Sequence, residues 1–317
     1  MDLKRRVVVT GMGVVSPVGS DVKTFWDNLA AGKSGITKLS IIDPEPYPSK
    51  IAGQVLDFDP SPYIDSKEAR RMDRFTQFAV SAAVQAVTDS GLDPESEDPS
   101  KVGVIIGSGI GGMKTFEDQY RTLLDKGAGR VSPFFIPMLI SDISSGIVSI
   151  RYNAQGPNYS VSSACATASH AIGSAFRAIK FGDADVMITG GAEAGIVSMG
   201  LAGFCSMKAL CTEFNDEPEK GSRPFDKKRC GFVIAEGSGV VVLEELEHAL
   251  KRGAKIYGEI KAVGMSADAH HMVAPHPEGR GAEIAMKKPW NRAACPRKRS
   301  TTSTPTGLPP IWATSPK

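Results

Sequence analysis

The residue with the clearest chemical potential is Cys165, which stands where an expected strand, 159–161, gives way to an expected helix. The helix follows an apolar period and ends before Gly182. A helix N-terminus carries unpaired N–H groups and partial positive charge, which favour a thiolate. Small neighbours leave room for a substrate: Ala164, Ala166 and Ala168. This context predicts a nucleophile, although a single cysteine more often only packs in a core.

A nucleophilic cysteine also needs a proton-handling partner, normally histidine. His170 lies five positions along the same helix, about 140° around its axis, so we expect it to face away from the thiol as a surface or interface residue. His248 lies in a charged amphipathic helix, where solvent exposure is expected. Three further histidines occupy a proline-bearing loop, a weak metal-ligand pattern: His270, His271 and His276. The sequence therefore pairs no histidine with Cys165 and predicts no metal site.

The composition is that of a folded protein, with 317 residues, 41% apolar and 23% charged. The formal charge of +2 gives no case for a nucleic-acid or membrane partner. No apolar run is long enough to span a membrane and no signal peptide is evident, so we expect a cytoplasmic location. Five cysteines without a Cys-x-x-Cys pair make a disulfide framework or zinc site unlikely. No cofactor is expected.

Short β-branched runs alternate with helical segments, which predicts an α/β fold with parallel strands and crossover helices. The expected helix covers 65–90, and the expected strands are 7–10, 102–106, 185–189, 240–243 and 256–263. Two glycine clusters, GMG at 11–13 and GSGIGG at 107–112, lack dinucleotide-binding spacing. We interpret both as tight turns at strand ends. One continuous unit is expected up to residue 288.

Several segments in order give a specific family resemblance. They are VVVTGMGVVSPVG, KEARRMDRF, GSGIGG, SPFFIPM, GPNYSVSSACATASHAIG, GDADVMITGGAE, SRPFDKKRCGF and SADAHHM. With these segments the chain resembles the β-ketoacyl-acyl-carrier-protein synthases of the elongating class, within the thiolase-like superfamily. The resemblance implies a layered α/β/α/β/α fold built from two similar halves, and usually a homodimer.

The resemblance also implies the chemistry. Cys165 would take an acyl chain from acyl carrier protein as a thioester, and malonyl-carrier would lose CO₂ to give the carbanion that attacks it. The Cys165 N–H would form half of an oxyanion hole. Three residues would line the acyl pocket: Ile110, Phe135 and Phe204. Six are candidates for a basic patch that meets the acidic carrier protein: Lys67, Arg70, Arg71, Lys126, Arg130 and Lys208.

The chain departs from the family pattern at two places. Cys230 stands where the family has Asp. After about Lys288 the family continues into segments like VDYINAHGTST, TKSMTGH and GFGG, which carry the catalytic histidines, the lysine and the second oxyanion donor. This chain contains none of them. We therefore expect an N-terminal half at 1–250, the start of a mostly missing C-terminal half at 251–288, and an aberrant tail at 289–317.

The tail is unlike the rest of the chain, with five basic residues, six prolines and no acidic residue. When the codons for 300–310 are read one base earlier, they permit VDYINAHGTST. We interpret the tail as frameshifted, and resequencing the gene tests this. Impaired condensation is then expected. Two alternatives stay open: a non-catalytic fragment that binds carrier protein or an intact subunit, and a thiolase-type enzyme that uses coenzyme A.

Overall fold

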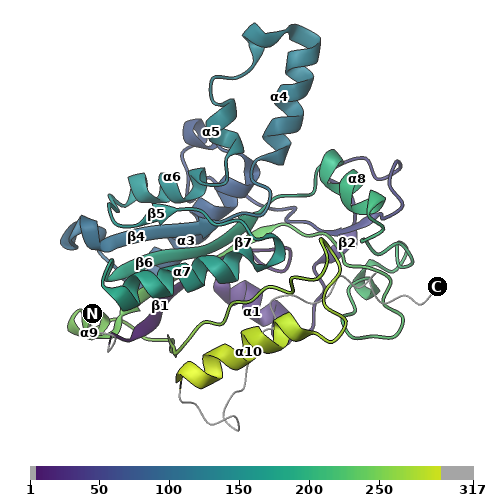
Figure 1. The fold of residues 1–317 in the computed structure, drawn as a ribbon. Coiled ribbons are helices and arrows are strands. Elements are labelled where there is room, and N and C mark those ends of the chain that lie inside the picture. The colour runs from purple at the N-terminus through teal and green to yellow at the C-terminus, as the bar shows by residue number, and fades with distance from the viewer. Residues whose placement is uncertain (1–4, 294–317) are drawn as a thin grey trace.

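The molecule is built around one mixed sheet. The structure, a computed structural model, describes residues 5–293, with side chains to residue 289. Six strands lie in the order β5-β4-β6-β7-β1-β8 (Figure 1). Strands β5, β4 and β6 run parallel, whereas β7, β1 and β8 each run antiparallel to a neighbour. The all-parallel expectation is therefore wrong for half of the sheet. The bounds are β1 Val7–Val15, β4 Val102–Gly107, β5 Asn158–Tyr159, β6 Val186–Glu193, β7 Gly237–Glu245 and β8 Gly258–Ile260.

Helices cover both faces of this sheet, as Figure 1 shows. Helices α3 (Arg74–Ser90) and α6 (Ile143–Arg151) pack on one face, where a core forms around the fully buried Phe75 and Phe78. Helix α7 (Thr167–Phe181) packs on the other, with Ile179 buried against Met187 of β6. The apolar stripes read from the sequence thus face the sheet. The result is three layers, α/β/α.

The first glycine cluster does not form a turn. Gly11 and Gly13 lie inside β1, where α3 passes so close that an added Cβ would lie 2.1 Å from the Ala86 carbonyl oxygen or 2.0 Å from that of Ala82. These glycines allow helix and strand backbones to approach, so the turn interpretation is wrong here. It is confirmed for the second cluster, which follows β4 and contains Gly111 at φ +74°.

The helix expected over 65–90 is two helices, α2 (Ser66–Ala69) and α3. Asp73 separates them because its carboxylate caps α3, accepting from the Phe75 N–H, and also accepts from the Thr115 N–H at 2.9 Å. The other elements are α1 Val22–Ala30, α4 Met113–Lys126, α5 Phe135–Leu139, α8 Ser198–Ser206, α9 Leu246–Lys251, α10 Arg280–Ala293, and a small sheet of β2 Ile36–Lys38 with β3 Ile51–Gly53.

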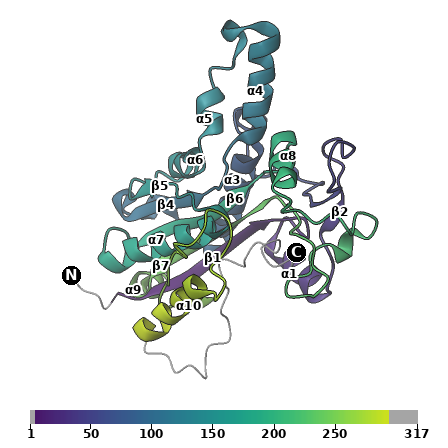
Figure 2. The same ribbon diagram turned by 45° about the vertical axis from the view of Figure 1, so that its right-hand side comes forward.

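Two peripheral features stand out in Figures 1 and 2. Helices α4 and α5 project from the sheet as an arm, and α10 lies at the opposite end of the molecule. Helix α10 continues through Pro289 to Ala293, so the first five residues of the expected aberrant tail are helical. The remainder of that tail, 294–317, lies outside the described residues. Within 5–293, no helix is long and apolar enough to cross a bilayer.

Candidate active site

Cys165 lies in a strained turn that leads directly into a helix. A single 3-10 turn, Ala164–Ala166, joins the segment after β5 to α7, which begins two residues beyond the cysteine. The expected helix start is confirmed, as is its end at Gly182, which has φ +83°. Ala164 adopts φ +51°, a conformation that alanine rarely takes. The thiol is exposed, so the strained turn presents it to an incoming reactant.

The end of α7 nearest the thiol is electropositive. Its cap residue, Ala166, has no side-chain acceptor to offer the first-turn N–H groups. The nearby Thr167 hydroxyl instead accepts from the Ser163 N–H at 2.8 Å, which fixes the turn. The positive end of the α7 dipole therefore lies at this turn, where it would stabilise negative charge on an oxygen held beside Cys165.

This turn lies at the carboxyl ends of parallel strands, the usual location of sites in open α/β sheets. A Cβ added to Gly107, at the end of β4, would lie 2.4 Å from Thr167 Cγ2. One added to Gly191, near the end of β6, would lie 2.7 Å from Ala168 Cβ. Glycine is therefore required at both positions for the start of α7 to pack directly on the sheet. This packing fixes the position of the turn that carries Cys165.

A half-buried carboxylate, that of Glu193, connects the neighbouring glycine loop to the sheet. It accepts from the Gly109 N–H at 2.8 Å and from the Ser108 hydroxyl at 3.1 Å. Ser162, in the thiol's own turn, donates to the Gly109 carbonyl at 3.2 Å. Burial raises the pKa of Glu193, and the hydrogen bonds from the loop oppose that rise. Sequence reasoning missed this residue, although the GGAE segment contains it.

His170 is held by the same turn but does not reach the thiol. Its Nδ1 lies 2.7 Å from the Ser163 hydroxyl, and the ring is half-buried. That His170 faces away from Cys165 as a surface or interface residue stays a prediction, because the hydrogen bond between its part-exposed ring and Ser163 tests neither point. Among the described residues, no histidine hydrogen-bonds the Cys165 thiol.

The three expected acyl-pocket residues come from different elements. Ile110 lies in the glycine loop, with its Cδ1 near Gly195. Phe204, on α8, packs edge-on against Phe232 at 5.3 Å between ring centroids. Phe204 packs on the apolar cluster that contains Ile234, and the Cδ1 atoms of Ile234 and Ile110 both border Gly195. Phe135 instead starts α5 on the projecting arm and packs against Phe116 of α4.

All six expected carrier-binding residues are exposed, and they fall in three places. Lys67 and Arg70 belong to α2 or its end, and the Arg71 guanidinium stacks on the Phe134 ring at 4.6 Å. Lys126 ends α4 and Arg130 follows it on the arm, while Lys208 comes just after α8.

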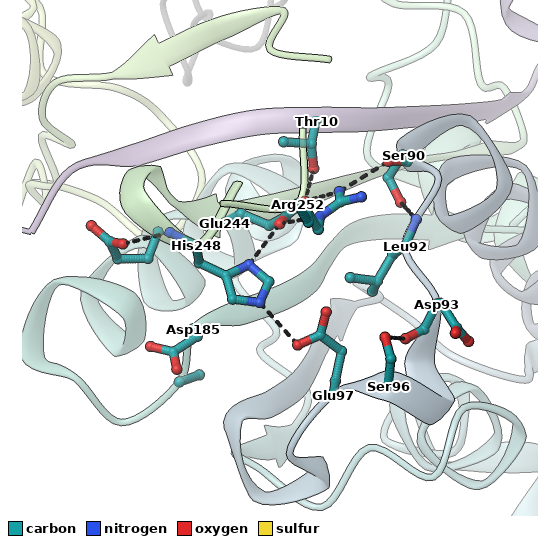
Figure 3. Close-up of polar contacts among 12 residues, drawn as sticks. Thr10, Ser90, Leu92, Asp93, Ser96, Glu97, Asp185, Glu244, His248 and Arg252 are labelled. Atoms are coloured by element: carbon teal, nitrogen blue, oxygen red, sulfur yellow. Dashed lines mark hydrogen bonds and ion pairs between the residues drawn. The ribbon is translucent and has the colours of Figure 1, made fainter. Parts of the chain in front are cut away.

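His248 belongs to a charge network and not to a solvated face, so its expected exposure is wrong. Its Nδ1 lies 2.8 Å from Glu244 and its Nε2 lies 2.9 Å from Glu97 (Figure 3). Glu244 is fully buried, and it also accepts from Arg252 and from the Thr10 hydroxyl. These partners raise the pKa of His248 to about 9, chiefly through Glu244. The donors outweigh burial and lower the pKa of Glu244 to about 2.

Potential metal ligands do not cluster in the described part of the chain. Between residues 5 and 293, no three His, Cys, Asp or Glu side chains gather as a metal site would require. The histidine-rich loop pairs the His270 and His276 rings at 5.2 Å, and Asp268 accepts from the His276 backbone N–H. That loop is therefore explained by local packing and turn bonds.

Comparison with known proteins agrees with this geometry. A family model described as "Beta-ketoacyl synthase, N-terminal domain" matches residues 4–249. The 3-oxoacyl-[acyl-carrier-protein] synthase 2 of Staphylococcus aureus (strain COL) is 50% identical over 313 residues, 97% of this chain and 75% of the relative. The enzyme of the same name from Vibrio cholerae serotype O1 is 49% identical over 284 residues, 90% of this chain and 68% of the relative.

Solved structures agree as well. A ketosynthase complex, described as a type II PKS acyl-carrier protein with its ketosynthase bound to the hexaketide, superposes with a TM-score of 0.84 at 30% identity, covering 93% of this chain and 71% of that one. A beta-ketoacyl synthase from Burkholderia phymatum gives 0.80 at 32% identity, covering 92% and 71%.

The layered fold and a thiol at the start of α7 define a thiolase-like condensing enzyme. More particularly, the chain belongs to the beta-ketoacyl synthase family of acyltransferases. The expected family and fold class are thereby confirmed.

Proposed function

We propose that this chain carries the acyl-transfer site of a 3-oxoacyl-[acyl-carrier-protein] synthase of fatty acid elongation, with Cys165 as the acyl acceptor. The observation that carries the proposal is the exposed Cys165 thiol on a strained turn at the start of α7. The names of the relatives and the shared carrier protein in a structural neighbour support the substrate class.

The proposed reaction has two stages. The Cys165 thiolate attacks an acyl-carrier thioester, so the acyl group moves to sulfur and the carrier leaves as its thiol. Malonyl-carrier then loses CO₂, and its enolate carbon attacks the acyl-Cys165 carbonyl to give 3-oxoacyl-carrier and free thiolate. No strong base is needed, because decarboxylation supplies the carbanion. The Cys165 N–H, in the same turn, is proposed as one oxyanion donor.

The remaining site residues take supporting roles in this proposal. Ile110, beside Gly195, and Phe204, on the Ile234 cluster, line the acyl pocket, and Phe135 contributes from the arm. The exposed basic residues of α2, the arm and the end of α8 receive the acidic carrier protein: Lys67, Arg70, Arg71, Lys126, Arg130 and Lys208.

A homodimer is part of the proposal. Strand β5 lies at one end of the sheet, and both of its residues are exposed, leaving backbone groups free to pair with another chain. Ile150 belongs to α6, the helix that contacts β5, and is 83% exposed, and the arm exposes Leu124 and Ile136. We propose that this edge and arm meet a second subunit. A cytoplasmic location is also proposed, because the relatives act on carrier-protein thioesters.

The test is acyl transfer followed by intact-protein mass spectrometry. Incubation with acyl-carrier protein should add one acyl group to the wild type and none to Cys165→Ala. Cys205→Ala is the matched control, because Cys205 is half-buried on α8 and should leave acylation intact. Acylation that persists in Cys165→Ala would sink the proposal.

A second arm separates the alternatives. If acyl-coenzyme A acylates Cys165 faster than acyl-carrier protein does, the thiolase-type function is favoured. If the carrier protein binds but no acyl transfer occurs, the non-catalytic fragment is favoured. Adding malonyl-carrier then reports whether condensation follows. Among residues 5–293 no histidine hydrogen-bonds the Cys165 thiol, so we expect acyl-Cys165 to accumulate with little 3-oxoacyl product.

A further inference from the structure

Two thiols outside the acyl-transfer site face each other across a short backbone bridge. The sulfurs of Cys211 and Cys230 are 3.0 Å apart, about 1 Å beyond the roughly 2.05 Å of a disulfide bond. The contact joins residues 19 positions apart in the chain. The acyl-transfer chemistry proposed above does not use either cysteine.

The backbone on both sides of the pair is fixed. The Cys211 N–H donates to the Phe232 carbonyl at 2.9 Å, and the Phe232 N–H donates to the Ala209 carbonyl at 3.0 Å. Gly231, next to Cys230, adopts φ +146°, and a Cβ there would lie 2.4 Å from the Leu210 carbonyl carbon. A glycine is therefore required for the two segments to come this close, and the approach sets the thiols against each other.

The two thiols differ in access. Cys211 is fully buried, whereas Cys230 is half-buried and reachable from solvent. Burial, followed by the neighbouring Cys230 thiol, raises the pKa of Cys211 to about 11. Cys211 therefore stays protonated at neutral pH, and a soluble oxidant meets Cys230 first. A metal is a poor explanation of the pair, because no third ligand gathers there among the described residues.

We propose that Cys211 and Cys230 form a reversible intramolecular disulfide, with Cys230 attacked first by a peroxide and Cys211 resolving the product. Peroxide transfers one oxygen to the Cys230 thiolate, giving the sulfenic acid and releasing hydroxide, which takes up a proton to become water. The Cys211 sulfur then displaces the sulfenic oxygen, which leaves as water with the Cys211 proton. A dithiol reductant reverses the bond by exchange. This site goes beyond the acyl-transfer function and does not depend on it.

The bond would act on the wall of the proposed acyl pocket. Leu210 precedes Cys211, and Phe232 follows Cys230 by two residues. Both belong to the same apolar cluster as Phe204, whose ring packs against Phe232. A disulfide would close the intervening loop, 212–229, onto this cluster. Closing a loop of that size constrains the unfolded chain, so the oxidised form should melt roughly 5 °C higher.

The test is peptide mapping of the full chain after brief peroxide treatment, acid quenching and alkylation without reduction. We expect a cross-linked peptide pair that joins Cys211 to Cys230, and loss of both of these thiols from the alkylatable pool. Reduced dithiothreitol should restore both. Cys211→Ser and Cys230→Ser should abolish the cross-link, and Cys205→Ser should leave it unchanged.

Two outcomes would overturn the proposal. One is that Cys211 and Cys230 both remain alkylatable after unfolding, at a peroxide dose that oxidises the exposed Cys165. The other is a cross-link equally abundant when oxidation is done in urea, since proximity in the fold would then not direct it. The wild-type map decides both points, even if a serine variant fails to fold. Acylation of Cys165 is measured separately, so failure of one proposal does not touch the other.

Discussion

At the scale of single residues, the half-buried carboxylate of Glu193 connects the end of β6 to the glycine loop beside the Cys165 turn. Its carboxylate accepts from the Gly109 N–H and the Ser108 hydroxyl, and Ser162 connects the same loop to the Cys165 turn. An ionised carboxylate offers only acceptors, which is what these donors need. The loop that carries Ile110 is thereby held at a fixed distance from the thiol.

Replacing this carboxylate should loosen the loop. Glu193→Gln keeps the shape but turns one acceptor into a donor, so one partly buried donor on the loop is left unpaired. We expect a loss of about 1–3 kcal/mol in unfolding free energy and slower acyl transfer to Cys165. Urea denaturation and the acylation assay measure the two effects. Glu219→Gln, at an exposed position, is the control and should be neutral. Unchanged stability and rate in Glu193→Gln would contradict the positioning role.

At the scale of elements, the close approach of β1 to α3 leaves no room for a side chain at Gly13. An added Cβ there would lie 2.0 Å from the Ala82 carbonyl oxygen, and backbone cannot give way as a side chain can. Gly13→Ala should therefore cost at least about 2 kcal/mol of unfolding free energy. Urea denaturation measures the loss.

The chain supplies a matched control for this change. Gly239 lies in β7, pairs with Val14 next to Gly13, and has nothing within 4 Å of an added Cβ. Gly239→Ala should be neutral or slightly stabilising, because alanine restricts the unfolded chain. If both variants lost the same unfolding free energy, the loss in Gly13→Ala would come from strand propensity and not from the contact with α3.

The same elements show what the sequence could predict. The apolar period of α7 and the cap glycine at 182 located the Cys165 turn, because both signals are local. The pattern could not show that Gly11 and Gly13 serve a helix contact, since Ala82 and Ala86 come from about 70 residues away. His248 was assigned to a solvated face for a similar reason: its partner Glu97 is 151 positions distant. The odd number and the spacing of the five cysteines argue against a disulfide framework, and they cannot show that Cys211 and Cys230, 19 positions apart, lie side by side.

At the scale of the whole molecule, one charge network joins segments from both ends of the described chain. The Glu244 carboxylate, on β7, forms hydrogen bonds with three side chains. They are Thr10 of β1, His248 of α9 and Arg252, which follows α9. His248 extends the network to Glu97 in the loop before β4. Figure 3 shows the imidazole placed between the two carboxylates. Removing one member leaves a buried charge unpaired, so the network should matter to global stability.

The contribution of this network to the free energy of unfolding should depend on pH, because the pKa values of His248 and Glu244 are both shifted. The pKa of His248 is raised from 6.5 to about 9, so its stabilisation is complete below pH 6.5 and is lost as pH rises through 9. The pKa of Glu244 is lowered from 4.5 to about 2, so its stabilisation is complete above pH 4.5 and is lost as pH falls through 2. Both are therefore complete together between pH 4.5 and 6.5.

The variant His248→Gln isolates the alkaline limb. Near pH 6 it should unfold with a free energy about 2 kcal/mol below that of the wild type, after allowance for solvent screening of a side chain that is one-fifth exposed. The difference should shrink steadily as the pH approaches about 10, because neutral histidine no longer attracts Glu97 and Glu244. Urea denaturation across this range, with Glu97→Gln and the double variant completing a cycle, measures the coupling between His248 and Glu97. A coupling that stays constant with pH would mean that the imidazole is held as a neutral hydrogen-bonding group, and the charged network drawn here would be wrong.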